Sequence, residues 1–327
     1  MTRRPLPLVP ALLLSACVSL ANPEPSVTVT VPPPSNTTTV PMTTTSIPAA
    51  TTTTLSAGSP VGLLTTTGVP VALRLVTPER YLVYSPCGNL AFVEDGEPIY
   101  PTSVILDPGH GGERDIGAVG RNGLPEKVAN LRVALETQRV LSEKGITSML
   151  TRTADYATTL TTRARFADTL QADLMVSIHH NAPTPGPSKL PGIEIFIQSD
   201  SAESRRLGGV LWTHALVALN QFDIAWTAAD DSGVMTVVNP RGTDAYGIIR
   251  TPETPTALIE LGYMSNPVEA ELFATEEYVE VAGQALADAI EAYLTTDAPG
   301  SGYVEEGRVF RPNPGLSRAD CVDPDLG

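Results

Sequence analysis

Three of the four histidines in the chain follow runs of apolar residues that we expect to form strands. His110 lies in VILDPGHGG, and His179 and His180 lie in DLMVSIHHNA. Ligands of open α/β sheets bind beyond the carboxyl ends of the strands, where these imidazoles are placed. The glycines beside His110 could cradle a phosphate, the imidazole could bind a metal, or the segment could be only a turn. His214 lies in an apolar helical pattern and is expected to be a packing or surface residue.

A carboxylate near these histidines would complete a metal site. Glu126 begins the helix that we expect directly after the GHGG turn. A His, Glu, His set is typical of catalytic zinc and leaves the fourth position for water. With two neutral imidazoles and one carboxylate as ligands, a Zn²⁺ site keeps a net positive charge. This charge lowers the pKa of a water molecule bound to the metal. Because adjacent strand residues point to opposite faces, we expect only one of His179 and His180 to be a ligand.

Two further acidic residues have placements that suggest chemistry. Glu260 ends the apolar run TALIE, where a carboxylate costs free energy unless it is paired or functional. It is our candidate for the proton acceptor, and a buried salt bridge is the alternative. Asp107 either orients a metal ligand or stabilises the turn at Pro108. The alternative for Glu126 is an ordinary first-turn glutamate favoured by the helix dipole.

Strands and helices that would position these side chains alternate from Ser103 onward. Helices are expected over 125–144 and 276–294, with apolar residues at helical spacing, and short apolar strands lie between the helical segments. This alternation predicts one α/β domain over 102–296, a single mostly parallel twisted sheet with helices on both faces. A small β-rich segment over 60–101 precedes it, and an acidic tail rich in Gly and Pro follows over 297–327.

The N-terminal region has the pattern of an exported protein. Residues 1–17 combine two arginines with an apolar run too short to span a bilayer, which is typical of a secretory signal. Their last four residues, LSAC, resemble a bacterial lipobox, so Cys17 is expected to carry a lipid that anchors the chain to the outer face of the membrane or the cell wall. An ordinary signal peptide is the alternative. Residues 18–59 are rich in Thr, Pro and Ser, and we expect a disordered tether.

Charge and the remaining cysteines restrict the partners further. The net charge of −15 and the lack of a basic cluster exclude nucleic acid as a partner. Lipidation of Cys17 would leave Cys87 and Cys321 as an even pair in an oxidising compartment. We expect them to form a disulfide that ties the tail to the segment before VILDPGHGG; two free thiols are the alternative.

Five segments, in order, resemble the motifs of zinc-dependent N-acetylmuramoyl-L-alanine amidases, the type 3 amidase family of cell-wall hydrolases. They are VILDPGHGG, GLPEKVANLRVA, LTRTADYATTLTTRARFA, VSIHHNA and TALIELGYMSNPVEAELF, spread over about the whole predicted α/β domain. The resemblance implies that His110, Glu126 and His179 bind Zn²⁺ and that Glu260 is the catalytic carboxylate. It implies peptidoglycan as the substrate, cut between N-acetylmuramic acid and the L-alanine of the stem peptide.

The resemblance also has implications for residues outside this set. Arg152, Asp155 and Arg163 match a family motif, and we interpret them as structural or as shaping the cleft. His180 stands where a small residue is frequent in the family, so its imidazole either contacts substrate or faces away. The segment between His180 and Glu260 has no long inserted helix, and we therefore expect an open cleft. We expect a monomer, and the sequence identifies no activator.

Two rival functions remain at this stage. A zinc peptidase acting within the stem peptide would use the same site on a different bond. A non-catalytic wall-binding module on the same fold is disfavoured because all four key residues are present.

Overall fold

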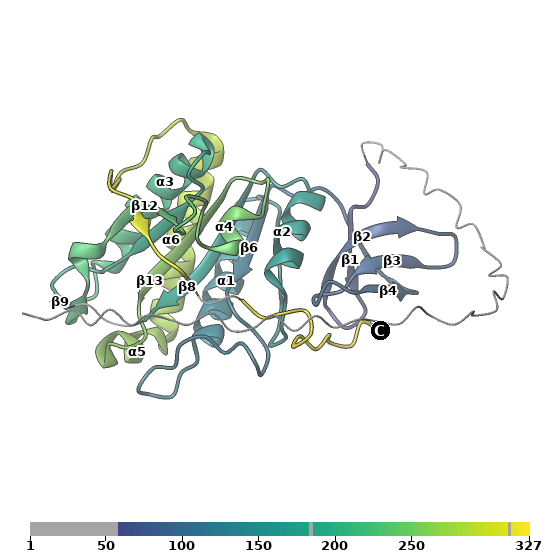
Figure 1. Cartoon of the computed structure of the whole chain (residues 1–327), viewed down its shortest axis with the longest axis horizontal. Coiled ribbons are helices and arrows are strands. Elements are labelled where there is room, and N and C mark those ends of the chain that lie inside the picture. The colour runs from purple at the N-terminus through teal and green to yellow at the C-terminus, as the bar shows by residue number, and fades with distance from the viewer. Residues whose placement is uncertain (1–57, 183–185, 313–314) are drawn as a thin grey trace, which may run out of the picture. The chain divides into compact units, whose positions relative to one another are not determined.

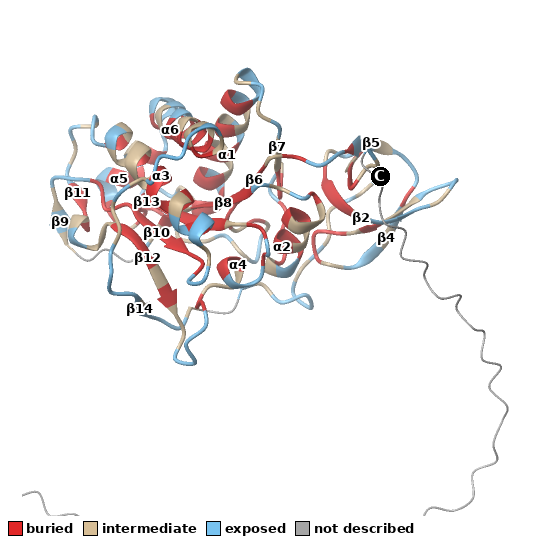
Figure 2. Ribbon diagram, turned by 90° about the horizontal axis from the view of Figure 1, so that it is seen from above, coloured by how far each residue is buried: buried red, intermediate tan, exposed pale blue. Residues whose placement is uncertain are grey.

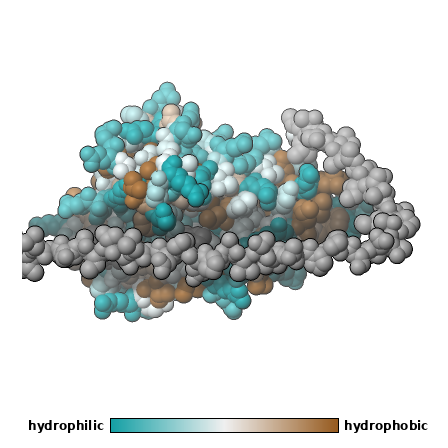
Figure 3. Space-filling model, viewed as in Figure 1, coloured by the Kyte–Doolittle hydropathy of each residue, from teal (hydrophilic) through white to brown (hydrophobic). Residues whose placement is uncertain are grey.

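The computed structural model describes residues 58–182, 186–312 and 315–327. The predicted signal sequence, Cys17 and nearly all of the tether fall outside these residues. Within the described part of the chain, no helix has the length and apolar character needed to cross a membrane. Hydrophobic residues lie in small groups among hydrophilic ones on the face shown in Figure 3.

A seven-stranded sheet forms the centre of the α/β domain, in the order β14-β12-β10-β13-β8-β6-β7 (Figure 1). All neighbouring strands are parallel except β10 and β13, which are antiparallel. The strands are β6 (Val104–Pro108), β7 (Ser148–Leu150), β8 (Leu174–Asn181), β10 (Glu194–Ile197), β12 (Gly233–Val238), β13 (Thr256–Tyr263) and β14 (Arg308–Val309). The predicted fold class is therefore confirmed, with β12 and β14 as strands that the sequence analysis missed.

Helices cover both faces of this sheet, as expected. One face packs against α1 (Glu126–Glu143), α3 (Ala202–Leu219) and α6 (Glu276–Thr295), and the other against α2 (Leu160–Thr169) and α4 (Gly247–Arg250). Side chains alternate along β6, so that Leu106 joins the first core and Ile105 the second. Figure 2 shows in red that the strands of this sheet are largely buried. The short α5 (Pro267–Phe273) begins after Asn266, whose side chain accepts a hydrogen bond from the Val268 amide.

The β-rich segment before this domain is an antiparallel five-stranded sheet in the order β4-β3-β2-β1-β5. Its strands are β1 (Gly62–Thr65), β2 (Pro70–Val76), β3 (Tyr81–Tyr84), β4 (Leu90–Val93) and β5 (Gly96–Ile99). Val61, Ala72 and Ile99 share a hydrophobic core with Phe166 and Leu170, at and just beyond α2. A separate two-stranded ribbon pairs β9 (Pro187–Ser188) with β11 (Trp226–Thr227), and a 3₁₀ turn follows at Ala229–Asp231.

The C-terminal tail is bound to the domain at several points. β14 pairs in parallel with β12, and the amide of Phe310 donates to the carbonyl of Val238 at 2.9 Å. Cys87 and Cys321 form the predicted disulfide, with their Cα atoms 5.5 Å apart. The tail in Figure 1 (yellow) runs from β14 past β13 and β8 toward the small sheet.

Candidate active site

His110 lies in a strained turn that the surrounding side chains hold in place. Its φ of 62° is in the left-handed region, which costs free energy for a residue with a Cβ atom. Arg152 donates to the carbonyls of Pro108 and Gly109, each at 3.0 Å. Arg163 donates to the carbonyls of Pro108 at 2.8 Å and His110 at 2.7 Å. Two buried guanidinium groups thus satisfy three consecutive carbonyls of the turn, which fixes the backbone of His110.

Asp107 belongs to the network below this turn. Its carboxylate accepts hydrogen bonds from Arg163 at 2.6 Å, Thr151 at 2.5 Å and Ser177 at 2.7 Å. Burial alone would raise the pKa of Asp107, but the charge of Arg163 and these hydrogen bonds lower it. The contacts match the turn-stabilising alternative for Asp107, and they agree with a structural role for Arg163.

The carboxylate that orients the His110 ring is Asp115, which the sequence analysis did not identify. Oδ1 of Asp115 lies 2.5 Å from Nδ1 of His110, and this contact leaves Nε2 directed toward Glu126. Metal-binding histidines usually donate their second ring nitrogen to a carboxylate or carbonyl in this way. The orienting role considered for Asp107 therefore belongs to Asp115.

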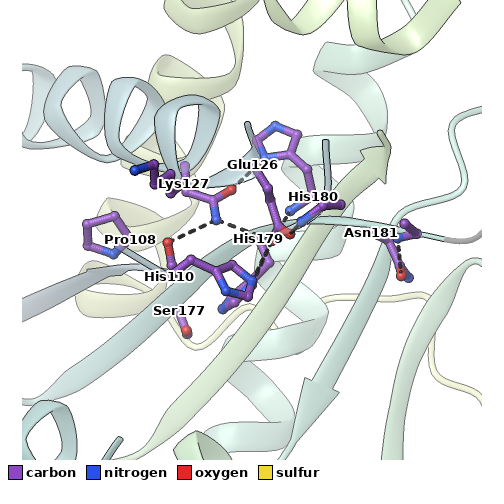
Figure 4. Close-up of polar contacts among 12 residues, drawn as sticks. Pro108, His110, Glu126, Lys127, Ser177, His179, His180 and Asn181 are labelled. Carbon is purple, nitrogen blue, oxygen red and sulfur yellow. Dashed lines mark hydrogen bonds and ion pairs between the residues drawn. The ribbon is translucent and has the colours of Figure 1, made fainter. Parts of the chain in front are cut away.

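The side chains of His110, Glu126 and His179 converge from three elements (Figure 4). Oε1 of Glu126 lies 3.2 Å from Nε2 of His110 and 3.0 Å from Nδ1 of His179. One ligand atom from each of the three residues falls within 4.8 Å of the others. Zinc bonds of about 2.0–2.1 Å in a tetrahedron separate neighbouring ligands by roughly 3.3 Å. The donor types and spacing of this set therefore fit a tetrahedral zinc site.

Electrostatics at this cluster favour a positive charge. Burial alone would lower the pKa of His110, but its contacts with Asp115 and Glu126 raise it to about 10. Burial would raise the pKa of Glu126, yet its hydrogen bonds to His110 and His179 lower it well below the ordinary value. Two carboxylates thus surround a position that suits a cation, either a proton or a metal ion.

Backbone and side-chain amides also fix the carboxylate of Glu126 through hydrogen bonds. Oε2 accepts a hydrogen bond from the amide of Ala118 at 2.8 Å, and the amide of Asn130 donates to Oε1 at 3.3 Å. At Gly117, whose φ is +68°, a Cβ atom would lie 2.5 Å from Oε2 of Glu126 and 2.7 Å from the His110 ring. Only glycine allows the chain to pass this close behind two of the three candidate ligands.

Glu260 lies on β13 beside His179 of β8 and Glu194 of β10. Its Oε2 atom is buried and has no hydrogen-bond partner in the described part of the chain, which does not match the salt-bridge alternative. Burial, followed by the charges of Glu126 and Glu194, raises the pKa of Glu260 well above its ordinary value. A buried carboxylate with a raised pKa is suited to accepting and releasing a proton.

One cavity of about 1000 Å³ connects these groups. His110, Glu126, His179 and Glu260 all line it. The side chains of His110 and His179 remain 26% and 16% exposed, so the candidate ligands can be reached from solvent. The open cleft expected from the sequence agrees with this exposure.

His180 borders the cavity, but its buried ring points into the core. Nδ1 lies 2.7 Å from the amide oxygen of Asn130, and Nε2 lies 2.8 Å from the hydroxyl of Tyr278. The ring also packs edge-on against Phe273, at 4.6 Å between centroids. Burial lowers the pKa of His180 to about 3, which keeps the imidazole neutral. Of the two alternatives for this residue, the structure supports the one in which it faces away from substrate.

Comparison with known proteins identifies the class to which this fold and site belong. Residues 104–292 match the Amidase_3 family of N-acetylmuramoyl-L-alanine amidases, and the chain belongs to this family. The uncharacterized protein YqiI of Bacillus subtilis is 36% identical over 214 residues, which are 65% of this chain and 92% of YqiI. The amidase AmiC of Neisseria meningitidis serogroup B is 27% identical over 220 residues, or 59% of this chain. This match spans about half (53%) of AmiC.

A solved structure supports the same assignment. The N-acetylmuramoyl-L-alanine amidase AmiC2 of Nostoc punctiforme superposes with a TM-score of 0.50 and 28% identity, covering 59% of this chain and 97% of that one. The chain is therefore an amidase of the peptidoglycan-hydrolysing class. The family match covers residues 104–292, so the small sheet before it and the C-terminal tail after it lie outside the match.

We predict that Gly109→Ala weakens zinc binding about 10- to 100-fold, the loss usual when the support of a ligand is disturbed. An ideal Cβ at Gly109 would lie 2.1 Å from Cε1 of His179, so the imidazole must move. Gly186→Ala is the matched control, because no heavy atom of the described chain lies within 4 Å of its Cβ position. Competition with a chelating dye measures both affinities, and equal values for the two variants would contradict the placement of His179.

We predict that His180→Ala lowers the free energy of unfolding of the metal-free protein by about 3 kcal/mol, because Asn130 and Tyr278 lose a buried partner. The folded variant should retain one zinc per chain. Urea denaturation measures the change, with His214→Ala on α3 as a partly exposed control. Unchanged stability together with lost turnover would instead place the His180 imidazole in the substrate site.

Proposed function

We propose that this enzyme hydrolyses the amide bond between the lactyl group of N-acetylmuramic acid and the L-alanine of the peptidoglycan stem peptide, with zinc as cofactor. His110, Glu126 and His179 would hold the metal, and Glu260 would act as general base. The observation that carries this proposal is the convergence of the three donors in one cavity with an unpartnered buried carboxylate. Membership of the amidase family supports the choice of bond.

Each residue of the site has a separate task in this mechanism. Bound zinc supplies a Lewis acid that polarises a carbonyl and lowers the pKa of water. Asp115 holds His110 in the orientation that presents Nε2 to the cluster. A carboxylate oxygen of Glu260 takes the proton of the attacking water and delivers it to the leaving amine of L-alanine. A new C–O bond replaces the C–N bond, and the raised pKa of Glu260 lets it hold the proton between the two events.

Export follows from the same proposal, because the substrate lies outside the cytoplasm. The Cys87–Cys321 disulfide supports an oxidising compartment. A lipid on Cys17 and a tether over 18–59 would keep the enzyme at the boundary between membrane and wall. We expect a monomer, and the sequence identifies no activator.

We predict that Glu260→Gln lowers kcat by about 10²- to 10⁴-fold, the usual contribution of a general base, and leaves one zinc per chain. Glu277→Gln, at an exposed position in the first turn of α6, is the matched control and should behave as the parent protein. Mass spectrometry of digested sacculi measures the rate at which stem peptides are released and identifies the bond that is cleaved. The parent should release stem peptides that begin at L-alanine and leave the glycan intact.

Two results would contradict this proposal. If the Glu260→Gln variant released stem peptides at a near-normal rate, Glu260 would not be the general base. Shortened stems still attached to glycan would show a peptidase that uses the same site on a different bond.

A further inference from the structure

The C-terminal residues 308–312 and 315–321, which we call the strap, cross the active-site cleft between two anchors. The first anchor lies at the edge of the seven-stranded sheet, where β14 pairs with β12. There Arg308 forms an ion pair with the buried Glu194, and its second nitrogen donates to the carbonyl of Asp231 at 3.0 Å. The strap therefore begins beside β10, the strand that pairs with the Glu260 strand.

The second anchor lies at the small sheet. Cys321 is covalently bound to Cys87, and Arg318 donates to the side chain of Asn89 at 2.7 Å. Asp323, just beyond the strap, accepts hydrogen bonds from the Cys87 amide at 2.7 Å and from the hydroxyl of Ser85 at 2.8 Å. A segment fixed covalently at one end and by strand pairing at the other keeps its position over the cleft.

Between these anchors the strap lines the same cavity as the candidate zinc ligands and Glu260. The ring of Phe310 lies 6.0 Å from that of Tyr246, which also lines the cavity. Gly315 runs so close to the start of α2 that a Cβ there would lie 2.8 Å from Leu160. Figure 1 shows this crossing in yellow below α2.

The strap forms a wall of the cleft and leaves the candidate ligands accessible, as the exposure of His110 and His179 shows. Of the strap residues that line the cavity, Phe310, Pro312 and Gly315–Ser317 carry no charge, and Asp320 is acidic. The carboxylate of Asp320 forms an ion pair with Arg114, with Oδ1 and Nη1 3.4 Å apart. The uncharged part of this wall, with its aromatic ring, suits the uncharged part of the substrate, namely the lactyl and L-alanine methyl groups next to the scissile amide.

We propose that the strap is a specificity-determining wall of the substrate site, kept in its binding position by the Cys87–Cys321 disulfide. The inference rests on the proposed function for the identity of the substrate. The strap lies outside the family-matched residues 104–292, so this wall is a feature of the chain's own C-terminal region. Pre-organisation by the disulfide lowers the entropy that substrate binding must otherwise overcome.

The test is the Kd of N-acetylmuramoyl-L-alanyl-D-isoglutamine for the zinc-loaded full chain, measured by calorimetry in the Glu260→Gln background. We expect the Kd to rise about fivefold to tenfold when Cys87→Ser and Cys321→Ser are combined, because the wall loses one anchor. Phe310→Ala, which keeps the disulfide, should raise the Kd in the same direction. Arg311→Ala is the matched control, because Arg311 lies in the same segment and faces a separate pocket with Asn239 and Pro240.

The outcomes separate the two proposals. An unchanged Kd in both Phe310→Ala and the double cysteine variant would overturn the strap inference, as would tighter binding after the disulfide is removed, which would make the strap an obstruction. A parent protein that binds the ligand but releases no stem peptides would overturn the proposed function alone. If the double cysteine variant fails to fold, the Kd of the Phe310→Ala variant alone tests the strap inference.

Discussion

The structure of the cleft depends on a buried carboxylate, that of Glu126, placed between two imidazoles. Glu126 is only 5% exposed, and a charge with so little solvent costs free energy unless cations and hydrogen-bond donors surround it. His110 and His179 contact one oxygen, and the amide of Ala118 satisfies the other. A cation at the centre would stabilise this arrangement, so under the proposed function metal binding would be coupled to the fold of the loop after β6.

Strain in the backbone of His110 is the second feature on which the site depends. The left-handed conformation turns the imidazole toward the cleft, and it persists because Arg152 and Arg163 bind the carbonyls around it. These arginines are themselves buried, and Asp107 offsets the charge of Arg163. Arg152, Arg163 and Asp107, which belong to the motifs seen in the sequence, therefore act together. They fix the direction of the imidazole ring of His110.

Much of this arrangement could be predicted from the sequence, because apolar strands and helical spacing carry strong signals. Strand alternation predicted that only one of His179 and His180 would face the cleft, and the family resemblance pointed to His179. In the structure the His179 ring joins the cluster around Glu126, and the His180 ring contacts Asn130 in the core. Asp115 could not be found, because its contact depends on how an irregular loop folds back on His110. β12 is an apolar run that could have been recognised as a strand, whereas β14 and the strap depend on tertiary pairing that no local pattern encodes.

We propose that the cluster around Glu126 holds a catalytic zinc ion, and the first measurement is the zinc content of the purified full chain. We expect one zinc per chain in the parent protein, loss of amidase activity on chelation, and recovery of activity when zinc is restored. Glu126→Gln should retain the fold, as seen by circular dichroism, and bind far less zinc. A parent protein that stays fully active with no bound metal after chelation would show that catalysis does not need zinc at this cluster.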